Sequence, residues 1–282
     1  MSSIAALAVS YRSASEIAGM AASLDGAVAH RSTVDLYVIE NGEDAAEAAT
    51  LAATAGVHKL VRNDRNLGYG GGVNAMVREL DHSYDWLLIC NPDIRFAPGS
   101  LDQLVAAAER SPGSALFGPQ IRTSEGEVYP SARTFPSLRT GTGHALFGKV
   151  WPTNPWTRRY QRAGMLDSTN DQLTDWLSGA CLLVRPHAFA QVHGFDEGYF
   201  MYFEDVDLAL RLSKAGWTAT WVPNAVITHS GAHSTQGQAA VMRRVHHASA
   251  RRYVEQKYRS PVLAPLRWAL RVGLFVRSRL GR

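Results

Sequence analysis

Short apolar runs alternate with longer stretches of mixed polarity through the first ninety residues. The apolar runs have the length of β-strands, and the stretches between them place apolar residues at helical spacing. We therefore expect strands at residues 4–9, 34–39, 58–62 and 86–90, with helices at residues 14–24, 45–55 and 70–80. Strands that alternate with helices are typical of βαβ units, so the pattern predicts an α/β, Rossmann-like fold with a mostly parallel sheet flanked by helices.

The regular pattern stops near residue 123 and returns near residue 172. The segment between is rich in Pro, Gly, Arg and Trp, which favours an irregular insertion beside the substrate over a plain surface excursion. Beyond it, residues 176–184 form one apolar run and predict a strand. Residues 208–216 predict a helix that ends at Gly216, and residues 218–222 predict another strand.

The residues that follow the expected strands are polar or glycine-rich. In a mostly parallel sheet, ligands bind beyond the carboxyl ends of the strands, so the site is expected there. The segments concerned are Ser10-Tyr11-Arg12, Glu40-Asn41-Gly42, residues 63–72 and Asn91-Pro92-Asp93.

Gly70, Gly71 and Gly72 would let the backbone approach a ligand closely at the start of a helix. Their spacing does not fit the dinucleotide pattern G-x-G-x-x-G, because Val73 stands where the last glycine should be. No G-K-[ST] of a P-loop is present either. A hydride-transfer enzyme and a P-loop ATPase are therefore not supported.

Asp93 is placed to bind a divalent cation. It follows the strand expected at residues 86–90, and Pro92 stiffens the turn that orients it. A hard cation held by one or two carboxylates can balance the charge of a diphosphate, whereas a turn-forming Asn-Pro-Asp without a ligand role is the alternative. His229 ends another apolar run and would complete a metal site if it reaches Asp93, and His233 follows it.

Three carboxylates gather in the segment Glu204-Asp205-Val206-Asp207, just before the helix that ends at Gly216. Acidic residues are common at helix starts as capping groups, which is the structural alternative. The aromatic run at residues 199–203 can, however, remove water from the neighbouring carboxylates and raise their pKa. A carboxylate with a raised pKa is suited to act as a general base.

Charge is unevenly distributed along the chain. Residues 243–282 hold eleven Lys and Arg against Glu255, a net charge of +10, whereas the whole chain carries +4. The basic region points to a phosphate-bearing or membrane surface rather than to nucleic acid, because it lacks aromatic platforms and a nucleic-acid-binding motif. Leu263, Leu266, Leu270 and Leu274 recur at helical spacing. They predict a membrane-surface helix with Trp268 at the headgroups, or else a helix packed on the catalytic domain.

Two further features bear on the compartment. The start MSSIAALAVSYRS has no basic region before an apolar run and no cleavage site, so we expect a cytoplasmic protein that is peripheral at the inner face of the plasma membrane. Cys90 and Cys181 each lie in an apolar run, which predicts buried free thiols.

The order of motifs closely resembles glycosyltransferase family 2 enzymes with the GT-A fold. The resemblance rests on Ala8-Val9-Ser10-Tyr11, Ile39-Glu40-Asn41-Gly42, Asn66-Leu67-Gly68-Tyr69, Asn91-Pro92-Asp93, Trp176-Leu177-Ser178-Gly179-Ala180, Phe195-Asp196-Glu197, Glu204-Asp205-Val206-Asp207-Leu208 and His229. Within that family the chain looks like the rhamnosyltransferases that act on N-acetylglucosaminyl-diphospho-polyprenol. The segments at residues 128–133, 151–156 and 232–235 suggest this subgroup.

The resemblance implies a role for each matching residue. The donor nucleotide would lie against Ser10, Tyr11, Glu40, Asn66, Gly68 and Asn91, and the acceptor would lie against Trp176, Gly179 and Ala180. Asp93 and His229 would hold Mg²⁺ or Mn²⁺. Asp205, with Glu204 beside it, would provide the general base. The family usually has Asp at the position of Glu40, and often at that of Asn91. The chain therefore departs from the family at the residue for base recognition and has one carboxylate fewer near the metal ligand.

By the same likeness, residues 1–235 would be the GT-A catalytic domain, and residues 236–282 would be a basic helical region in contact with the membrane. An inverting transfer of L-rhamnose from dTDP-rhamnose to a lipid-linked saccharide is expected, and a homodimer is left open. Another donor or acceptor is the alternative within the family.

Two alternatives lie outside the family. A sugar nucleotidyltransferase would need a Gly- and Arg/Lys-rich triphosphate loop, which AVSYRSASE does not supply. A catalytically silent membrane-surface protein would not be expected to combine Asp93, Glu204, Asp205 and His229.

Overall fold

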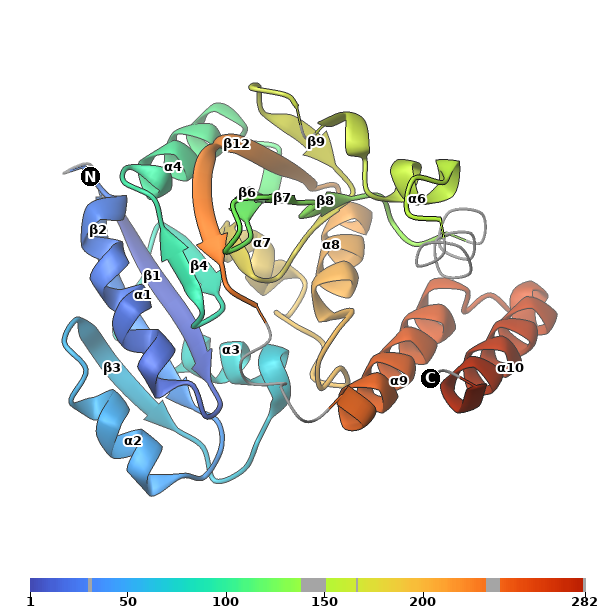
Figure 1. Cartoon of the computed structure of the whole chain (residues 1–282), viewed down its shortest axis with the longest axis horizontal. Coiled ribbons are helices and arrows are strands. Elements are labelled where there is room, and N and C mark those ends of the chain that lie inside the picture. The colour runs from blue at the N-terminus through green and yellow to red at the C-terminus, as the bar shows by residue number, and fades with distance from the viewer. Residues whose placement is uncertain (30–31, 138–150, 166, 232–238, 281–282) are drawn as a thin grey trace.

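The computed structural model describes residues 1–29, 32–137, 151–165, 167–231 and 239–280 (Figure 1). Its centre is one sheet with the strand order β3-β2-β1-β4-β11-β6-β12-β5, in which β11 and β5 run against the other strands. The bounds are Ser2–Ser10 (β1), Ser32–Glu40 (β2), Val57–Arg62 (β3), Trp86–Cys90 (β4), Ile94–Phe96 (β5), Ser114–Arg122 (β6), Cys181–Val184 (β11) and Thr218–His229 (β12). The predicted α/β fold with a mostly parallel sheet is confirmed.

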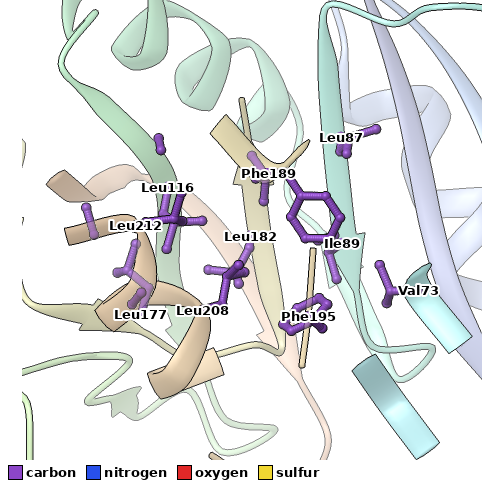
Figure 2. Packing of buried hydrophobic residues seen from close by; sticks show 14 of the residues in the cluster. Val73, Leu87, Ile89, Leu116, Leu177, Leu182, Phe189, Phe195, Leu208 and Leu212 are labelled. Carbon is purple, nitrogen blue, oxygen red and sulfur yellow. The ribbon is translucent and has the colours of Figure 1, made fainter. Parts of the chain in front are cut away.

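Helices cover both faces of this sheet. The helices α1 (Ala14–Ala27), α2 (Ala45–Ala52) and α4 (Ser100–Arg110) bury side chains in one core, and α3 (Gly68–Arg78), α7 (Pro186–Gln191) and α8 (Glu204–Lys214) bury side chains in the other. Successive residues of a strand point to opposite faces, so Ala6 of β1 belongs to the first core and Leu7 to the second. Figure 2 shows the second core, where Leu87 and Ile89 of β4 cluster with Val73 of α3.

The glycines of α3 serve internal packing. A Cβ at Gly70 would lie 2.8 Å from the Cβ of Phe195, and one at Gly72 would lie 3.1 Å from a methyl group of Val9. The close approach that these glycines permit is therefore to the protein's own core. The expectation that they also bring the backbone close to a ligand stays a prediction.

The apolar run at residues 176–184 is two strands, not the single strand predicted. Trp176–Leu177 (β10) pairs with Ala132–Arg133 (β8) in a separate two-stranded sheet, and Cys181–Val184 (β11) enters the main sheet. The chain turns between them because the amide of Ser178 bonds to the small sheet, where it donates to the carbonyl of Ser131 at 2.8 Å. Both cysteines are buried and free, as predicted, and they face each other across β4 and β11.

The strand predicted at residues 218–222 is longer than expected. β12 continues to His229 through an irregularity between Val222 and Val226, and it carries His229 to the site. The segment predicted to be an irregular insertion holds short elements in its described part. These are Val128–Tyr129 (β7), β8, Pro155–Tyr160 (α6) and Ala163–Met165 (η1), followed by Gln172–Thr174 (β9).

Two helices follow β12. Ala239–Lys257 (α9) packs on the chain ahead of α8, where Arg252 forms an ion pair with Asp196 at 2.7 Å and Tyr253 is buried. After Pro261–Leu263 (η3), Ala264–Leu280 (α10) lies beside α9, as Figure 1 shows. Among the described residues, no helix is both long and apolar enough to span a membrane.

The predicted leucine stripe of α10 is not its exposed face. Leu266, Leu270 and Leu274 are partly buried, while Trp268 and Phe275 are 68% and 58% exposed. Because α10 packs against α9, we infer that the leucines lie on the side of α9. Trp268 and Phe275 are seven residues apart, so they share the other side of the helix.

Candidate active site

Glu40 ends β2 with one carboxylate oxygen that lacks a hydrogen-bond partner among the described residues. The side chain is fully buried, and its Oε1 accepts a hydrogen bond of 2.6 Å from the amide of Gly42. Its Oε2 is buried without a hydrogen-bond partner among the described residues. A buried acceptor without a donor is costly, so a ligand that offers an N–H group there would satisfy it. The partly exposed ring of Tyr11 lies directly beside Gly42.

Ser10, at the end of β1, is held within the protein. Its hydroxyl donates to Glu47 at 2.5 Å and lies 3.1 Å from the hydroxyl of Ser13, and the residue has no exposed surface. Its contribution to the site is thus the position of the backbone that leads into Tyr11.

Asn41 organises the loop that carries Asn66 and Gly68. Its Nδ2 donates to the side chain of Asn66 at 3.1 Å and to the carbonyl of Gly68 at 3.0 Å, and its Oδ1 accepts from the amide of Leu67 at 3.1 Å. Gly68 has a φ of +73°, and a Cβ there would lie 2.2 Å from the carbonyl oxygen of Phe200. Only glycine fits this position without strain. The sequence showed Asn41 only as a polar residue after a strand, and its organising role depends on these contacts.

Asp93 and His229 come together from β4 and β12. Asp93 Oδ1 lies 3.1 Å from His229 Nε2, and the side-chain amide of Asn91 lies 3.2 Å from the same nitrogen. Burial raises the pKa of Asp93, but the hydrogen bond and charge of His229 together with backbone donors outweigh it, and the net pKa is lowered. The carboxylate is therefore ionised over the working range of pH.

This pair fits a divalent cation that is shared with a ligand. A carboxylate oxygen and an imidazole nitrogen are both ligands of divalent cations, and Asp93 Oδ1 and His229 Nε2 lie 3.1 Å apart. No set of three or more His, Cys, Asp or Glu side chains around one point is found in the described residues, and His233 lies outside them. Phosphate oxygens and water would have to complete the coordination.

Asp205 is fixed in the first turn of α8, not ahead of the helix as predicted. Its Oδ2 accepts from the amide of Gly179 at 3.0 Å, and its Oδ1 accepts from the amide of Val206 at 2.8 Å. Gly179 is held in turn by Tyr69, whose hydroxyl donates to its carbonyl at 2.8 Å. A side chain at Gly179 would have only 3.3 Å to the Cβ of Asp205, so a small residue suits this approach.

One turn of chain links Asp205 to the Asp93–His229 pair. The carbonyl of Ala180, next to Gly179, accepts from the amide of Asn91 at 2.9 Å. Asn91 contacts His229, and Gly179 contacts Asp205. Trp176, three residues earlier, is buried, and its Nε1 donates to the carbonyl of Thr134 at 2.9 Å.

The two adjacent carboxyl groups on α8 have raised pKa values. Burial, followed by the charge of Asp205, raises the pKa of Glu204. Burial also raises the pKa of Asp205, although the amides of Gly179 and Val206 and the charge of Arg133 oppose this. Once Asp205 is ionised, Glu204 therefore retains its proton. Asp207 is set apart, because it forms a 2.7 Å ion pair with Arg211.

The turn before these carboxyl groups is held by α9. Tyr202 and Phe203 both have a φ of +67°, which is unfavourable for aromatic residues. The ring of Phe203 packs 5.5 Å from that of Tyr253, and the hydroxyl of Ser249 donates to the carbonyl of Met201 at 2.8 Å. The helix thus stabilises the conformation that positions Glu204 and Asp205.

We expect Glu204→Gln to lower turnover far less than Asp205→Asn, because the amide resembles the protonated acid. It should also change the pH dependence of stability. The raised pKa means that Glu204 favours folding fully below about its ordinary value of 4.5, and this contribution is lost as the pH rises toward the raised pKa. From pH 5 to pH 8, the free energy of unfolding measured in urea should therefore fall less in Glu204→Gln than in the wild type. An equal loss of turnover in the two variants would contradict the assignment of the base.

Comparisons with known proteins identify the family of the chain. Residues 4–260 match the family described as glycosyltransferase like family 2. The chain is 41% identical over 284 residues to N-acetylglucosaminyl-diphospho-decaprenol L-rhamnosyltransferase of Mycobacterium tuberculosis H37Rv, a match that covers 97% of this chain and 91% of that protein. It is 30% identical over 199 residues to the rhamnosyltransferase WbbL of Escherichia coli K12, with 67% and 71% of the two chains covered.

The fold is also that of solved glycosyltransferases. The mannosyltransferase PcManGT from Pyrobaculum calidifontis, solved with GDP-Man and Mn²⁺, superimposes with a TM-score of 0.60 at 12% identity over 99% of this chain and 70% of that one. This likeness establishes the GT-A type of fold. Together with the match over residues 4–260, it shows that the chain belongs to glycosyltransferase family 2.

Proposed function

We propose that this glycosyltransferase moves L-rhamnose from dTDP-rhamnose to a hydroxyl of N-acetylglucosaminyl-diphospho-polyprenol, with inversion at the anomeric carbon. The geometry that carries the catalytic part of the proposal is the placement of Asp205 beside the Asp93–His229 pair, through the turn at Gly179 and Ala180. The 41% identity to the mycobacterial enzyme over 97% of the chain supports the choice of sugar and acceptor.

Asp205 takes the proton from the acceptor hydroxyl as that hydroxyl attacks the sugar in a single displacement. Its raised pKa makes it a stronger base than an exposed aspartate. Asp93 and His229 would hold Mg²⁺ or Mn²⁺, which when bound supplies positive charge for the departing nucleotide diphosphate. The buried Oε2 of Glu40, which has no hydrogen-bond partner among the described residues, would accept the ring N–H of a pyrimidine base, and Tyr11 provides a ring beside the neighbouring Gly42.

A panel of nucleotide sugars tests the choice of donor. The purified protein would be incubated with the lipid-diphosphate acceptor and dTDP-L-rhamnose, UDP-N-acetylglucosamine or GDP-mannose, and the released nucleotide diphosphate would be measured. We expect acceptor-dependent release with dTDP-L-rhamnose at least tenfold faster than with the others, because both sugar and base contacts differ. Faster release from another donor would reject rhamnose as the sugar.

We also propose that α10 holds the enzyme at an anionic membrane surface on the cytoplasmic side, where a lipid-linked acceptor would be met. The exposed apolar residues of this helix, including Trp268 and Phe275, support the proposal. Several basic residues of the region are already engaged within the chain. Arg252 pairs with Asp196, Arg271 pairs with Glu255, and Arg267 bonds to the carbonyls of Tyr258 and Ser260. Apolar contact should therefore contribute more than the net charge alone suggests.

Truncation after Ser260 should leave a folded protein that binds its sugar nucleotide but no longer sediments with anionic vesicles. α9 and its contacts with the catalytic domain remain in this variant, whereas η3 and α10 are removed. The double variant Trp268→Ser, Phe275→Ser should weaken vesicle binding roughly tenfold or more, since two large apolar side chains lose their burial in the lipid. Leu173→Ser, which changes an apolar residue that is 61% exposed on β9, is the matched control. Vesicle binding that survives truncation would reject the anchor.

A further inference from the structure

Arg133 lies in a cage of aromatic rings beside the catalytic turn. Its guanidinium carbon is 5.2 Å from the ring centre of Tyr129, 5.9 Å from that of Tyr160 and 5.2 Å from that of Trp176. The residue is on β8, directly opposite Trp176 of β10 in the small sheet. Aromatic faces attract a cation and hold its plane in one orientation, so this guanidinium is preorganised.

Arg133 forms no ion pair within the part of the chain that the structure describes. No carboxylate of the described residues lies within ion-pair distance of Arg133. Its Nε donates to the carbonyl of Pro130 at 2.8 Å and its Nη2 donates to the hydroxyl of Tyr129 at 2.6 Å, and Tyr160 is a further hydrogen-bond partner. A guanidinium has five N–H donors, so donors remain for a ligand. Arg133 as a whole is half-buried, so part of the residue reaches the surface.

The cage is close to the general base. Two residues separate Trp176 from Gly179, whose amide binds Asp205. Burial lowers the pKa of Arg133, but its interactions with Tyr129, Tyr160 and Asp205 outweigh burial, and the net pKa is raised. The positive charge of Arg133 in turn opposes the rise that burial causes in the pKa of Asp205. A permanent cation thus lies near the point where the acceptor hydroxyl must be deprotonated.

We propose that Arg133 binds a phosphate of the lipid-diphosphate acceptor while the acceptor sugar lies against Asp205, an assignment that rests on the proposed function. The diphosphate is attached across the same sugar ring that carries the attacking hydroxyl. A site that holds both needs a base and an anion-binding group on one side of the donor, and the turn from Trp176 to Gly179 supplies this pairing. A guanidinium fork suits phosphate oxygens better than an ammonium group does.

Two acceptors separate this role from a structural one. Initial rates would be measured with a short-chain prenyl-diphosphate N-acetylglucosamine and with an alkyl N-acetylglucosaminide that lacks the diphosphate. The rates would be measured at a pH high enough for the rate to be independent of pH, so that a change in the pKa of Asp205 does not contribute. Arg133→Gln should raise the KM for the diphosphate acceptor at least tenfold. It should leave the KM for the donor and kcat/KM for the alkyl glycoside within about threefold.

Two further variants serve as controls. Arg159→Gln removes an exposed charge from α6 and should preserve the wild-type preference for the diphosphate acceptor. Arg133→Lys keeps the charge without the fork and should show a smaller loss that is again confined to the diphosphate acceptor. If Arg133→Gln unfolds at a temperature far below that of the wild type, Arg133→Lys replaces it as the test variant.

The possible results distinguish a failure of the phosphate site at Arg133 from a failure of the proposed function. Equal losses on both acceptors in Arg133→Gln and in Arg133→Lys would show that the cage is structural and overturn the assignment. A preference for the diphosphate acceptor that persists in both variants would also overturn it, with the proposed function intact. A wild-type protein without any such preference would contradict the proposed acceptor itself and the phosphate site with it.

Discussion

Asp205→Asn is expected to lower turnover roughly 10²-fold or more while the affinity for the sugar nucleotide stays within a few fold. The amide cannot accept the proton of the attacking hydroxyl, and Asp205 is bound by the amide of Gly179, which belongs to the segment expected to contact the acceptor. The loss should therefore fall on the chemical step. Single-turnover rates and nucleotide binding by calorimetry would separate the two effects.

The hydrogen bonds of Asp205 require a matched control. Both carboxylate oxygens accept from backbone amides, and an Asn side chain can accept at only one of them. Some loss of stability, about 1–3 kcal/mol, is therefore expected as well. Asp207→Asn breaks the buried ion pair with Arg211 on the same helix and should destabilise the fold without a comparable loss in the chemical step. A collapse of nucleotide binding in Asp205→Asn would instead assign Asp205 a structural role.

Removal of the divalent cation is the second change with a large expected effect. We expect a chelator to abolish most of the activity and Mg²⁺ or Mn²⁺ to restore it, and Asp93→Asn to lose roughly 10²-fold or more. A neutral amide is a far poorer ligand for a hard dication than a carboxylate. The dependence of turnover on metal concentration would be measured for each protein.

Asn91→Asp provides a control in which metal binding is expected to become stronger, not weaker. Asn91 contacts His229 at the metal pair, so a carboxylate there adds a charged ligand and should lower the metal concentration needed for half-maximal turnover. Full turnover in chelator, or in Asp93→Asn, would remove the cation from the mechanism.

The first half of the fold was readable from sequence because each element there is local. β4 has the predicted bounds, Trp86–Cys90, and the segments after the strands contain Glu40, Asn66 and Asp93. Strand period and length suffice for such elements, and the sheet rule places the site at the strand ends.

The second half depends on contacts that are distant in sequence. The run at residues 176–184 is apolar apart from Ser178. It is divided into two strands where the Ser178 amide bonds to Ser131, between the pairing of Trp176 with Arg133 and the contact of Gly179 with Asp205. The leucines of α10 have the spacing of a membrane face, yet the neighbouring α9 changes which side is exposed. Neither effect leaves a local signal in the amino-acid pattern.

The role of α9 was hidden for the same reason. In the sequence, the motif Phe195-Asp196-Glu197 contributes to the family resemblance but gives no role for Asp196. In the structure, Asp196 accepts hydrogen bonds from Arg252 and Gln256. Those contacts place α9 against the strained turn at Tyr202 and Phe203. A helix in the basic region thus supports the position of the base, as well as leading to α10.

The most direct test of the central claim is the structure of the lipid product. The full-length protein would be incubated with dTDP-L-rhamnose, Mg²⁺ and N-acetylglucosaminyl-diphospho-polyprenol, and the product would be analysed by mass spectrometry and by NMR of its new anomeric centre. An Asp205-assisted single displacement predicts one added deoxyhexose whose anomeric configuration is opposite to that in the donor. A product with the donor's configuration, or no rhamnosylated lipid while another nucleotide sugar is consumed, would contradict the account.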